Sequence, residues 1–343
     1  MRTRGACAGG GLAGAVLSAS LALAFIPSAR AAAPQPSFDC AKASTVVEKT
    51  ICKDPKLAEK DAKLADAYKA SLARLPEPDR ADFHNGQREW IRFTRLVCGV
   101  KSDFQSPETC LSQAYDTRQK QVETSYVALG GLKFRRIDRF DARLSPANQD
   151  YPNAKDFPTI TREVSYPQID QPASPGEIGF NAEVSRRVQK FGGFEADADD
   201  QTDYSFGFSL LNASPRLISV ELDQYMYEHG AAHGQPSSSM LNWLPKENRA
   251  LKTSDVFDSS KTWADFLKAY CFKILSKQEG SFVDSIQKLD GLPDNPERWR
   301  FTPEGLAIHF NPYEVAAYAF GEPEVVVPWK VLKPYLVADP AIR

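Results

Sequence analysis

Four clustered cysteines constrain the fold of this chain more than any other feature. Cys40, Cys52, Cys98 and Cys110 are separated by 11, 45 and 11 residues. These spacings match no short zinc-binding knuckle, and the only histidine nearby is His84. In an oxidising compartment, four clustered cysteines are typical of two disulfides in a small domain. The sequence therefore predicts a disulfide-linked domain rather than a metal site.

The N-terminus predicts such a compartment. Arg2 and Arg4 precede an apolar run over 12–26, and small residues of the A-x-A kind end at Ala31. The run is shorter than the ~20 residues that a membrane-spanning helix needs. Cys7 lies before the run, where a lipoprotein cysteine cannot be. We therefore predict a signal peptide over residues 1–31 and a periplasmic or secreted mature protein without a membrane anchor.

Charge narrows the choice of partners. Removing the three arginines of the signal peptide lowers the formal net charge from -2 to -5. A mildly acidic protein is a poor partner for nucleic acid and is compatible with a cationic protein, although the same charge also keeps proteins soluble. No phosphate loop, dinucleotide fingerprint or catalytic triad order is present, so we predict no cofactor and no catalytic residue.

Apolar stripes predict three helices in the first domain, residues 37–130. The ranges are 55–75, capped by Asp54, then a helix capped by Asp79 and ending at Cys98, and a third from about Pro107. In an antiparallel hairpin of the first two helices, Cys52 lies near Cys98. We therefore expect the pairs Cys52–Cys98 and Cys40–Cys110.

Asp61 falls on the apolar face of the first of these helices, where a carboxylate needs a partner. Arg88 or Arg92 could supply one. A structural ion pair is the interpretation favoured over a catalytic acid.

The cysteine framework resembles the N-terminal domain of the lysozyme inhibitor LprI family. The resemblance covers about residues 37–126 and rests on these segments: Phe38–Ala43, Val47–Cys52, Leu64–Tyr68, Gln87–Trp90, and Cys110-Leu111 with Tyr115 and Arg118. The family commonly has an arginine and an acidic residue just before its third cysteine, where this chain has Arg95-Leu96-Val97. The resemblance implies a helical domain that binds lysozyme.

Beyond residue 130 the sequence changes to short alternating runs and turns, which define a second domain over 131–343. Strands are expected over 159–166, 204–211, 217–227, 301–310 and 324–329, and helices over 179–191, with Ile178 facing inward, and 263–275. The second helix contains Cys271, expected to be a small buried apolar residue. The predicted fold class is α+β: a small disulfide-linked α-helical domain followed by a mixed, largely antiparallel sheet with packed helices.

The second domain resembles the extracellular domain of RsiV-type anti-sigma factors, also found beside some peptidoglycan deacetylases. The resemblance covers about residues 160–336 and is carried by these segments: Tyr166-Pro167, Ile178–Phe191, Leu217–Val220, Tyr225–Gly234, Leu251–Phe257, and Phe310–Ala316 with Gly321. The prototype binds lysozyme as a sensor. The resemblance implies a binding module.

Two groups of residues are candidate contacts with a partner. His229 and His233 are four residues apart, as zinc ligands on a helix are, but Gly230 stands where a zinc protease has glutamate. Loop packing or contact with a partner is therefore favoured over metal binding. Tyr225 and Tyr227 are candidate contacts in the same segment. The acidic run contains Glu195, Asp197, Asp199, Asp200 and Asp203. It lacks the glycine and glutamate of an EF-hand, which leaves a solvated loop or charges that steer a cationic partner. Ser237–Ser239 are expected to form a polar turn.

These observations favour a secreted, non-catalytic binding protein directed at lysozyme or another cationic cell-wall hydrolase. A peptidoglycan-binding accessory module or cell-wall enzyme is the alternative, and a structural role in the envelope is a third.

Overall fold

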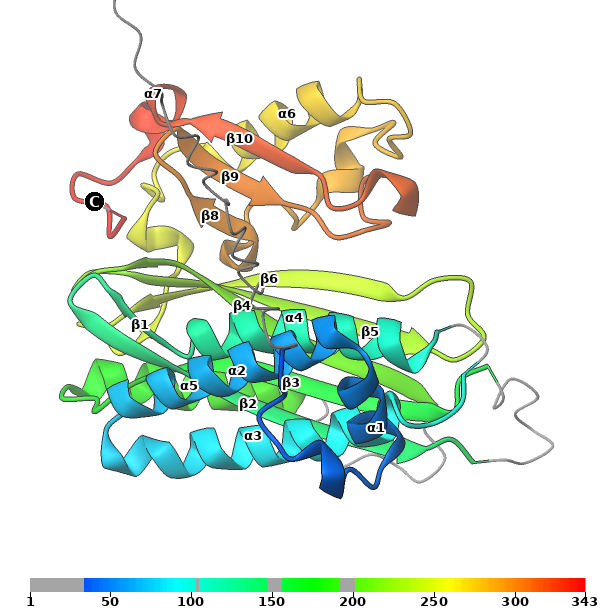
Figure 1. The fold of residues 1–343 in the computed structure, drawn as a ribbon. Helices are drawn as coiled ribbons and strands as arrows, with labels where there is room; N and C mark the ends of the chain where they lie inside the picture. Colours follow the sequence, from blue (N-terminus) through cyan, green and yellow to red (C-terminus); the bar gives the residue numbers. More distant parts are fainter. Residues whose placement is uncertain (1–33, 103–104, 147–155, 192–200, 343) are drawn as a thin grey trace, which may run out of the picture. The chain divides into compact units, whose positions relative to one another are not determined.

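Helices occupy the first part of the described chain, as the apolar stripes predict. The computed structural model describes residues 34–102, 105–146, 156–191 and 201–342, so the signal-peptide prediction lies outside the described residues. After a short 3-10 turn at Cys40–Lys42 come α1 (Val46–Lys53), α2 (Pro55–Arg74), α3 (Glu77–Val97) and α4 (Pro107–Glu123) (Figure 1). The predicted α+β fold class is confirmed.

The helix ends follow local capping chemistry. The Asp54 side chain accepts a hydrogen bond from the Lys56 backbone N–H at 2.8 Å, as expected of an N-cap. Asp79, predicted to cap the next helix, does not, because α3 begins at Glu77. Its carboxylate is instead buried 3.1 Å from Arg135 Nε.

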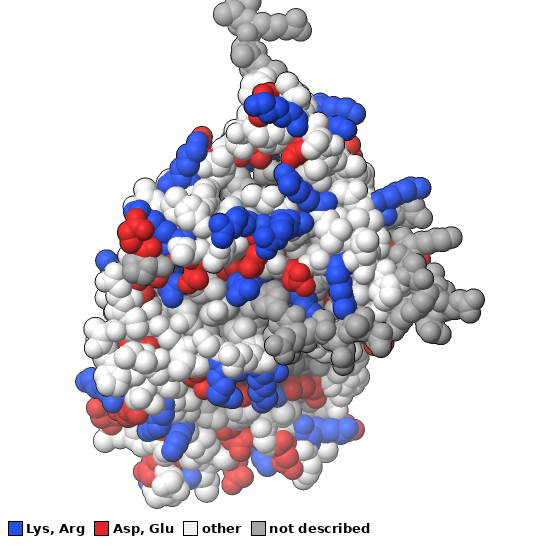
Figure 2. Space-filling view, turned by 90° about the horizontal axis from the view of Figure 1, so that it is seen from below, with Lys and Arg blue, Asp and Glu red and all other residues white. Residues whose placement is uncertain are grey.

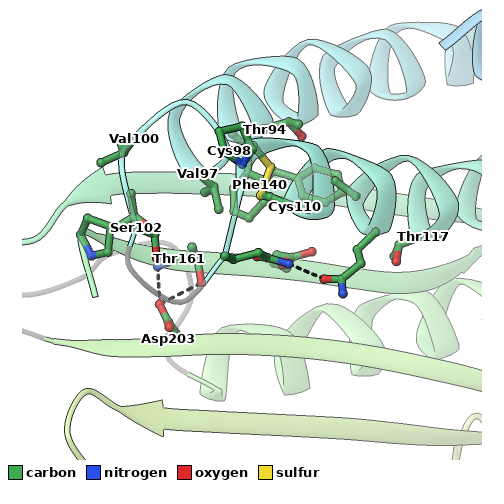
Figure 3. A pocket seen from close by; sticks show the side chains of 18 of the residues that line it. Thr94, Val97, Cys98, Val100, Ser102, Cys110, Thr117, Phe140, Thr161 and Asp203 are labelled. Atoms are coloured by element: carbon green, nitrogen blue, oxygen red, sulfur yellow. Dashed lines mark hydrogen bonds between the residues drawn. A yellow bond between two sulfur atoms is a disulfide. The ribbon is translucent and has the colours of Figure 1, made fainter. Parts of the chain in front are cut away.

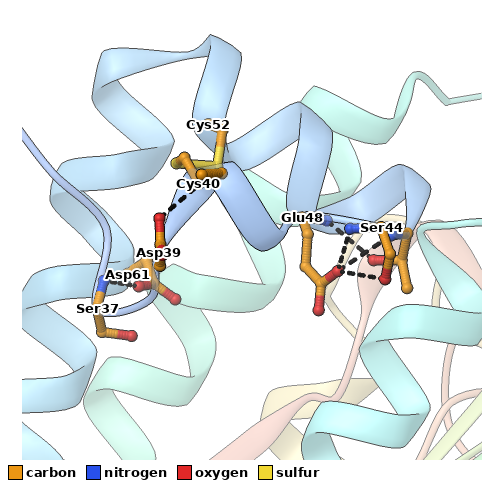
Figure 4. Close-up of a disulfide and its surroundings, with 9 residues drawn as sticks. Ser37, Asp39, Cys40, Ser44, Glu48, Cys52 and Asp61 are labelled. Atoms are coloured by element: carbon orange, nitrogen blue, oxygen red, sulfur yellow. Dashed lines mark hydrogen bonds between the residues drawn. A yellow bond between two sulfur atoms is a disulfide. The ribbon is translucent and has the colours of Figure 1, made fainter.

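The disulfide pairing predicted from a hairpin is wrong. One bond joins Cys40 to Cys52 (Figure 4), and the other joins Cys98 to Cys110. The reason is that α2 packs mainly on α4, while α3 packs mainly on strand β2. The first two long helices therefore do not form the close hairpin that would bring Cys52 to Cys98. Each disulfide instead closes a short local segment.

A seven-stranded sheet follows the helices. Its spatial order is the sequence order, β1 (Tyr126–Leu129), β2 (Leu132–Leu144), β3 (Thr159–Ile169), β4 (Thr202–Ala213), β5 (Ile218–Glu228), β6 (Gln235–Leu244) and β7 (Arg249–Ala250). All neighbours are antiparallel except β3 and β4, which are connected through α5 (Pro175–Lys190). Ser237–Ser239 lie within β6, so their prediction as a turn is wrong.

Helix α3 lies along β2. A Cβ on Gly86 would stand 2.8 Å from the Asp138 backbone oxygen, so only glycine allows this approach. Nearby, the Glu89 carboxylate accepts a hydrogen bond from the Phe140 backbone N–H at 3.1 Å. The helix thus satisfies a backbone group that an open strand edge would leave unpaired.

The two faces of the sheet are covered differently. Phe180 and Val184 of α5 pack on Val164, Phe206 and neighbouring apolar side chains of one face. Ile178, expected to face inward, is 56% exposed, because it lies on the outer side of α5. The opposite face is polar in its centre and holds the site described below.

A second, three-stranded sheet closes the chain, in the order β10 (Glu324–Pro328), β9 (Gly305–His309), β8 (Trp299–Phe301). With α6 (Trp263–Leu275) and α7 (Trp329–Leu332) it builds the largest apolar core, around the fully buried Trp299. Cys271 is buried in that core, as predicted, with a free thiol. Residues Pro34–Arg343 form one compact unit, and none of the helices in its described part is both long and apolar enough to span a bilayer.

Candidate functional site

Alternation along the central strands gives the sheet a polar face. Residue i and residue i+2 of a strand share a face, so Glu163 and Ser165 of β3 point to the same side. The strand register places Ser205 of β4 beside Glu163, and Tyr225 of β5 beside Ser205. The sequence carries this signal as polar residues at every second position of 161–165.

A cavity of about 480 Å³ lies between this face and helices α3 and α4. Figure 3 shows Thr94, Cys98 and Cys110 on the helical side and Phe140, Thr161 and Asp203 on the sheet side. The Cys98–Cys110 disulfide forms part of its lining, so a bond that stabilises the helical part also shapes the cavity.

A second cavity, of about 360 Å³, continues along the same face. Gln121 and Glu163 line both cavities, so we treat them as one site, the sheet cleft. Its floor in the second cavity contains Asp223, Tyr225 and Ser238. Glu322, from the segment before β10, lies there as well.

Glu163 is the central acid of the sheet cleft. Its side chain is largely buried and makes no hydrogen bond or ion pair with any described residue. Burial, together with the nearby carboxylates of Asp203 and Asp138, raises the pKa of Glu163 to about 7. Burial likewise raises the pKa of Asp223, although the Ser238 hydroxyl donates to it at 3.0 Å. Perturbed carboxyl groups in a cleft mark a functional candidate.

A third cavity lies within the helical part. This helical groove, of about 520 Å³, is lined by Phe38, Ile51, Tyr68, Trp90 and Ile91, with charged groups such as Glu48 and Arg95 among its other lining residues. Glu48 and Arg95 form an ion pair of 2.6 Å. Backbone hydrogen bonds from Thr45 and Ser44 lower the pKa of Glu48 to about 2, so it stays ionised (Figure 4).

Asp61 also lines the helical groove, but its predicted arginine partners are wrong. It accepts hydrogen bonds from the Tyr115 hydroxyl at 2.7 Å and from the Ser37 backbone N–H at 2.5 Å. A hydroxyl and an amide, rather than an ion pair, satisfy this carboxylate.

The two candidate histidines pack and form hydrogen bonds at the end of β5 and in the loop that follows it. His229 is almost fully buried, 3.1 Å from Asp203, and stacks on Phe157. His233 stacks on Tyr318 with ring centroids 3.8 Å apart and hydrogen-bonds the Tyr313 hydroxyl at 2.9 Å. The two imidazoles do not converge, and within the described ranges no cluster of three His, Cys, Asp or Glu side chains could hold a metal ion.

The other predicted contact residues are dispersed. Tyr225 is 40% exposed and lines the sheet cleft, whereas the Tyr227 hydroxyl donates to the Ala231 carbonyl. Asp197, Asp199 and Asp200 lie outside the described residues. Asp203 accepts hydrogen bonds from the backbone and hydroxyl of Thr161 at 2.7 and 2.8 Å, so it braces the sheet beside the cleft.

Surface charge on one face of the molecule is mixed. Figure 2 shows lysines and arginines interspersed with aspartates and glutamates there.

Comparison with known proteins matches both parts of the chain to families. The family described as "Lysozyme inhibitor LprI" matches residues 39–118, and "Protein of unknown function (DUF3298)" matches residues 254–330. The chain therefore carries an LprI lysozyme-inhibitor domain and, towards its C-terminus, a DUF3298 domain. The LprI match confirms the first resemblance; the DUF3298 match is compatible with the RsiV-like one and does not test it.

Curated relatives match segments of the chain. Lipoprotein LprI of Mycobacterium tuberculosis, like that of Mycobacterium bovis, is 34% identical over 86 residues, which are 25% of this chain and 40% of the relative. Peptidoglycan-N-acetylmuramic acid deacetylase PdaC of Bacillus subtilis is 21% identical over 189 residues, 53% of this chain and 40% of the relative. The matched segments thus span about two fifths of each relative.

Two solved structures of DUF3298 proteins are similar to the chain. One, from Bacteroides fragilis, has a TM-score of 0.44 at 16% identity and covers 63% of this chain and 98% of its own. The other, from Pseudomonas aeruginosa, has a TM-score of 0.43 at 15% identity and covers 61% and 95%. The match of residues 39–118 to the LprI family supports a lysozyme-inhibitor-like or cell-wall-related role.

Proposed function

We propose that this chain is an exported, non-catalytic protein that binds and inhibits a lysozyme-type cell-wall hydrolase. The observation that carries the proposal is the match of residues 39–118 to the lysozyme inhibitor LprI family. Those residues also build nearly all of the helical groove. The family and the groove therefore point to the same part of the molecule.

The groove has the chemistry of a protein-binding site. Protein interfaces combine an apolar centre with a polar rim, and aromatic residues are frequent among their strongest contacts. Tyr68 supplies partly exposed aromatic surface, and Ile91 is 39% exposed. The carboxylates of the lining, Asp39, Glu48 and Asp61, outnumber its cations, Lys42 and Arg95. We infer that an apolar side chain of the hydrolase enters the groove while its basic groups meet these carboxylates.

Export supports the same role. A signal peptide over 1–31 would send the chain to the compartment where such hydrolases act, and where two disulfides persist. We propose cleavage after Ala31, which the mass of the protein purified from its host's envelope or medium checks.

Inhibition is tested with the mature protein and a c-type lysozyme. Cell-wall lysis is followed as protein is added, and calorimetry measures binding. We expect a stoichiometric loss of lysis that weakens as salt rises, because exposed charges act mainly on association. If neither heat nor inhibition is seen at tens of micromolar, lysozyme is not the partner.

The location of the contact is tested with a matched pair of variants. Ile91→Arg places a charge in the groove from an exposed position of α3, so folding is retained. Ile178→Arg makes the same change at a site 56% exposed on α5. We expect Ile91→Arg to inhibit at least about tenfold more weakly than the parent, as for loss of an interface anchor. We expect Ile178→Arg to inhibit as strongly as the parent. Equal inhibition by both would place the contact elsewhere.

A further inference from the structure

The sheet cleft presents chemistry that the proposed function does not use. Its combined cavities fall in the range of about 300–1,000 Å³ typical of small-molecule sites. Many of the residues that line it carry uncharged hydrogen-bonding side chains, among them Ser102, Gln105, Gln113, Thr117, Gln121 and Thr161 in the first cavity, and Ser205, Tyr225 and Ser238 in the second. Amides and hydroxyls donate and accept together, as a ligand rich in hydroxyl groups requires.

Aromatic and apolar surface lies beside these groups. Phe93 and Phe140 line the first cavity, with ring centroids 5.7 Å apart, and Tyr225 lines the second. A sugar ring presents hydroxyls at its edge and C–H groups on its faces, so it suits a cleft that combines amides with aromatic rings.

The charge of the cleft selects among sugars. Its lining holds five carboxylates, those of Asp156, Glu163, Asp203, Asp223 and Glu322. Among the described lining residues the one cation is Arg136, and it is bound to Asp138 at 2.6 Å. The cleft therefore favours a positively charged ligand.

Glu163 is the position where such a charge would bind. It lines both cavities, and its carboxyl group has no partner among the described residues. Glu163 is only partly exposed, and a largely desolvated carboxylate without a partner is costly. An ammonium group would supply a charge-assisted hydrogen bond. Asp203 is less available, because Thr161 and His229 already bond it.

We propose that the sheet cleft binds an oligosaccharide that carries free amino groups, and that the Glu163 carboxylate accepts a hydrogen bond from one of its ammonium groups. This inference goes beyond the proposed function, because the cleft lies between the helices and the sheet, whereas the helical groove lies within the helices. A de-N-acetylated cell-wall glycan has this chemistry. A basic loop of a protein partner is the competing occupant, but the excess of amides and hydroxyls over carboxylates favours the sugar.

The test uses the mature chain and two tetramers, β-1,4-linked glucosamine and its N-acetylated form, titrated by calorimetry at neutral pH. We expect the glucosamine tetramer to bind and the N-acetylated one to bind at least about tenfold more weakly, since it lacks the charge that pairs with Glu163. Equal or tighter binding of the N-acetylated tetramer, or no binding of either, overturns the proposal.

Variants place the ligand in the cleft. Glu163→Gln keeps the size of a side chain that bonds nothing else, so it should fold, which thermal melting checks. We expect it to weaken the glucosamine tetramer at least about tenfold, whereas Glu247→Gln, on an exposed turn, leaves binding unchanged. An unchanged affinity in Glu163→Gln overturns the assignment.

A proton readout separates a direct role of Glu163 from a structural one. Because the pKa of Glu163 is about 7, binding of an ammonium group there should release the Glu163 proton at about pH 6, where the amino groups of the tetramer are already charged, and this release is seen as a dependence of the heat on the buffer. Asp138, Asp203, Asp223 and Glu322 face the same region and remain in Glu163→Gln. Proton release should therefore persist in Glu247→Gln and fall in Glu163→Gln; equal release in both would contradict the proposal.

Lysozyme separates this inference from the proposed function. If Glu163→Gln weakens lysozyme binding while neither tetramer binds, the cleft is a protein-docking site and the sugar proposal is wrong. If the glucosamine tetramer binds and lysozyme does not, the sugar inference stands and the proposed function fails.

Discussion

Arg118 of α4 donates a hydrogen bond to Asp138 of β2 at 2.7 Å, and the exposed fractions of the two side chains are 0% and 4%. Asp138 also accepts from Arg136 at 2.6 Å and from the Ser165 hydroxyl at 2.7 Å. Burial opposes ionisation of Asp138, but the two arginines hold its pKa below the ordinary value. Arg118 is the last residue of the LprI match, so this ion pair ties the LprI domain to the sheet.

Removing one partner of this pair should be strongly destabilising. Arg118→Met leaves the buried Asp138 carboxylate with Arg136 as its one charged partner and leaves the side-chain oxygens of Gln87 and Gln121 without this donor, so we expect the free energy of unfolding to fall by about 3 kcal/mol. Adding both Asp138→Leu and Arg136→Met removes the remaining charged groups together and should restore part of the loss. Urea unfolding followed by circular dichroism measures both.

Lys63→Met is the control for this prediction. Lys63 pairs with Glu59 on the exposed surface of α2, where such pairs contribute about 0.3–0.5 kcal/mol. A loss in Arg118→Met no larger than in Lys63→Met would show that the buried pair does not tie the helices to the sheet.

The contact of α3 with the sheet should weaken as pH rises. Burial and a hydrogen bond with Asp170 raise the pKa of Asp79 from 3.8 to about 6, against the opposing charge of Arg135. The folded state therefore binds a proton that the unfolded state has lost. This contribution is complete below about pH 4 and disappears as pH rises through 6. Unfolding midpoints measured between pH 4 and 8 should show the decline.

Asp79→Asn keeps a side chain that can form hydrogen bonds but cannot ionise. We expect this variant to be more stable than the parent at pH 8 and to lose much of the decline. Glu163, with a pKa raised to about 7, adds a decline of the same sign, so Glu163→Gln is measured in parallel. If the stability of Asp79→Asn follows that of the parent at every pH, Asp79 does not bind the extra proton in the folded state.

The sequence predicts elements well where a stripe or an alternation continues unbroken. Helix α6 occupies the range predicted from its apolar spacing, and the buried Leu111, Tyr115, Arg118 and Val122 of α4 follow its regular stripe. Local periodicity reports which side of an element is buried, because each residue's face is fixed by the geometry of its own helix or strand.

What the sequence does not predict is which elements become neighbours. The predicted hairpin of α2 and α3 is wrong because α4, not α3, packs closely on α2. For the same reason the sequence does not predict the sheet cleft. The polar alternation around Glu163 was visible, but nothing local indicates that α3 and α4 cover that face.

The observed disulfides make a clear prediction for peptide mapping. Non-reducing digests should contain Cys40 linked to Cys52 and Cys98 linked to Cys110. Each bond joins residues 12 apart, which by loop entropy contributes about 3 kcal/mol. The double variant Cys40→Ala/Cys52→Ala should lose that amount in urea unfolding and keep its helical circular dichroism. A digest that links Cys52 to Cys98 would contradict this arrangement.

Cys271 should be inert in the folded protein. Its side chain is fully buried, and burial raises the pKa of its thiol to about 12, so almost no reactive thiolate forms at neutral pH. We expect no reaction of the folded mature protein with a disulfide reagent, and one thiol per chain after unfolding without reductant. Lys246→Cys, on an exposed turn, should add one thiol that reacts at once in the folded state. Rapid labelling of the parent protein would show that the α6 core opens, since a thiol so placed becomes accessible only when that helix separates from β9 and β10.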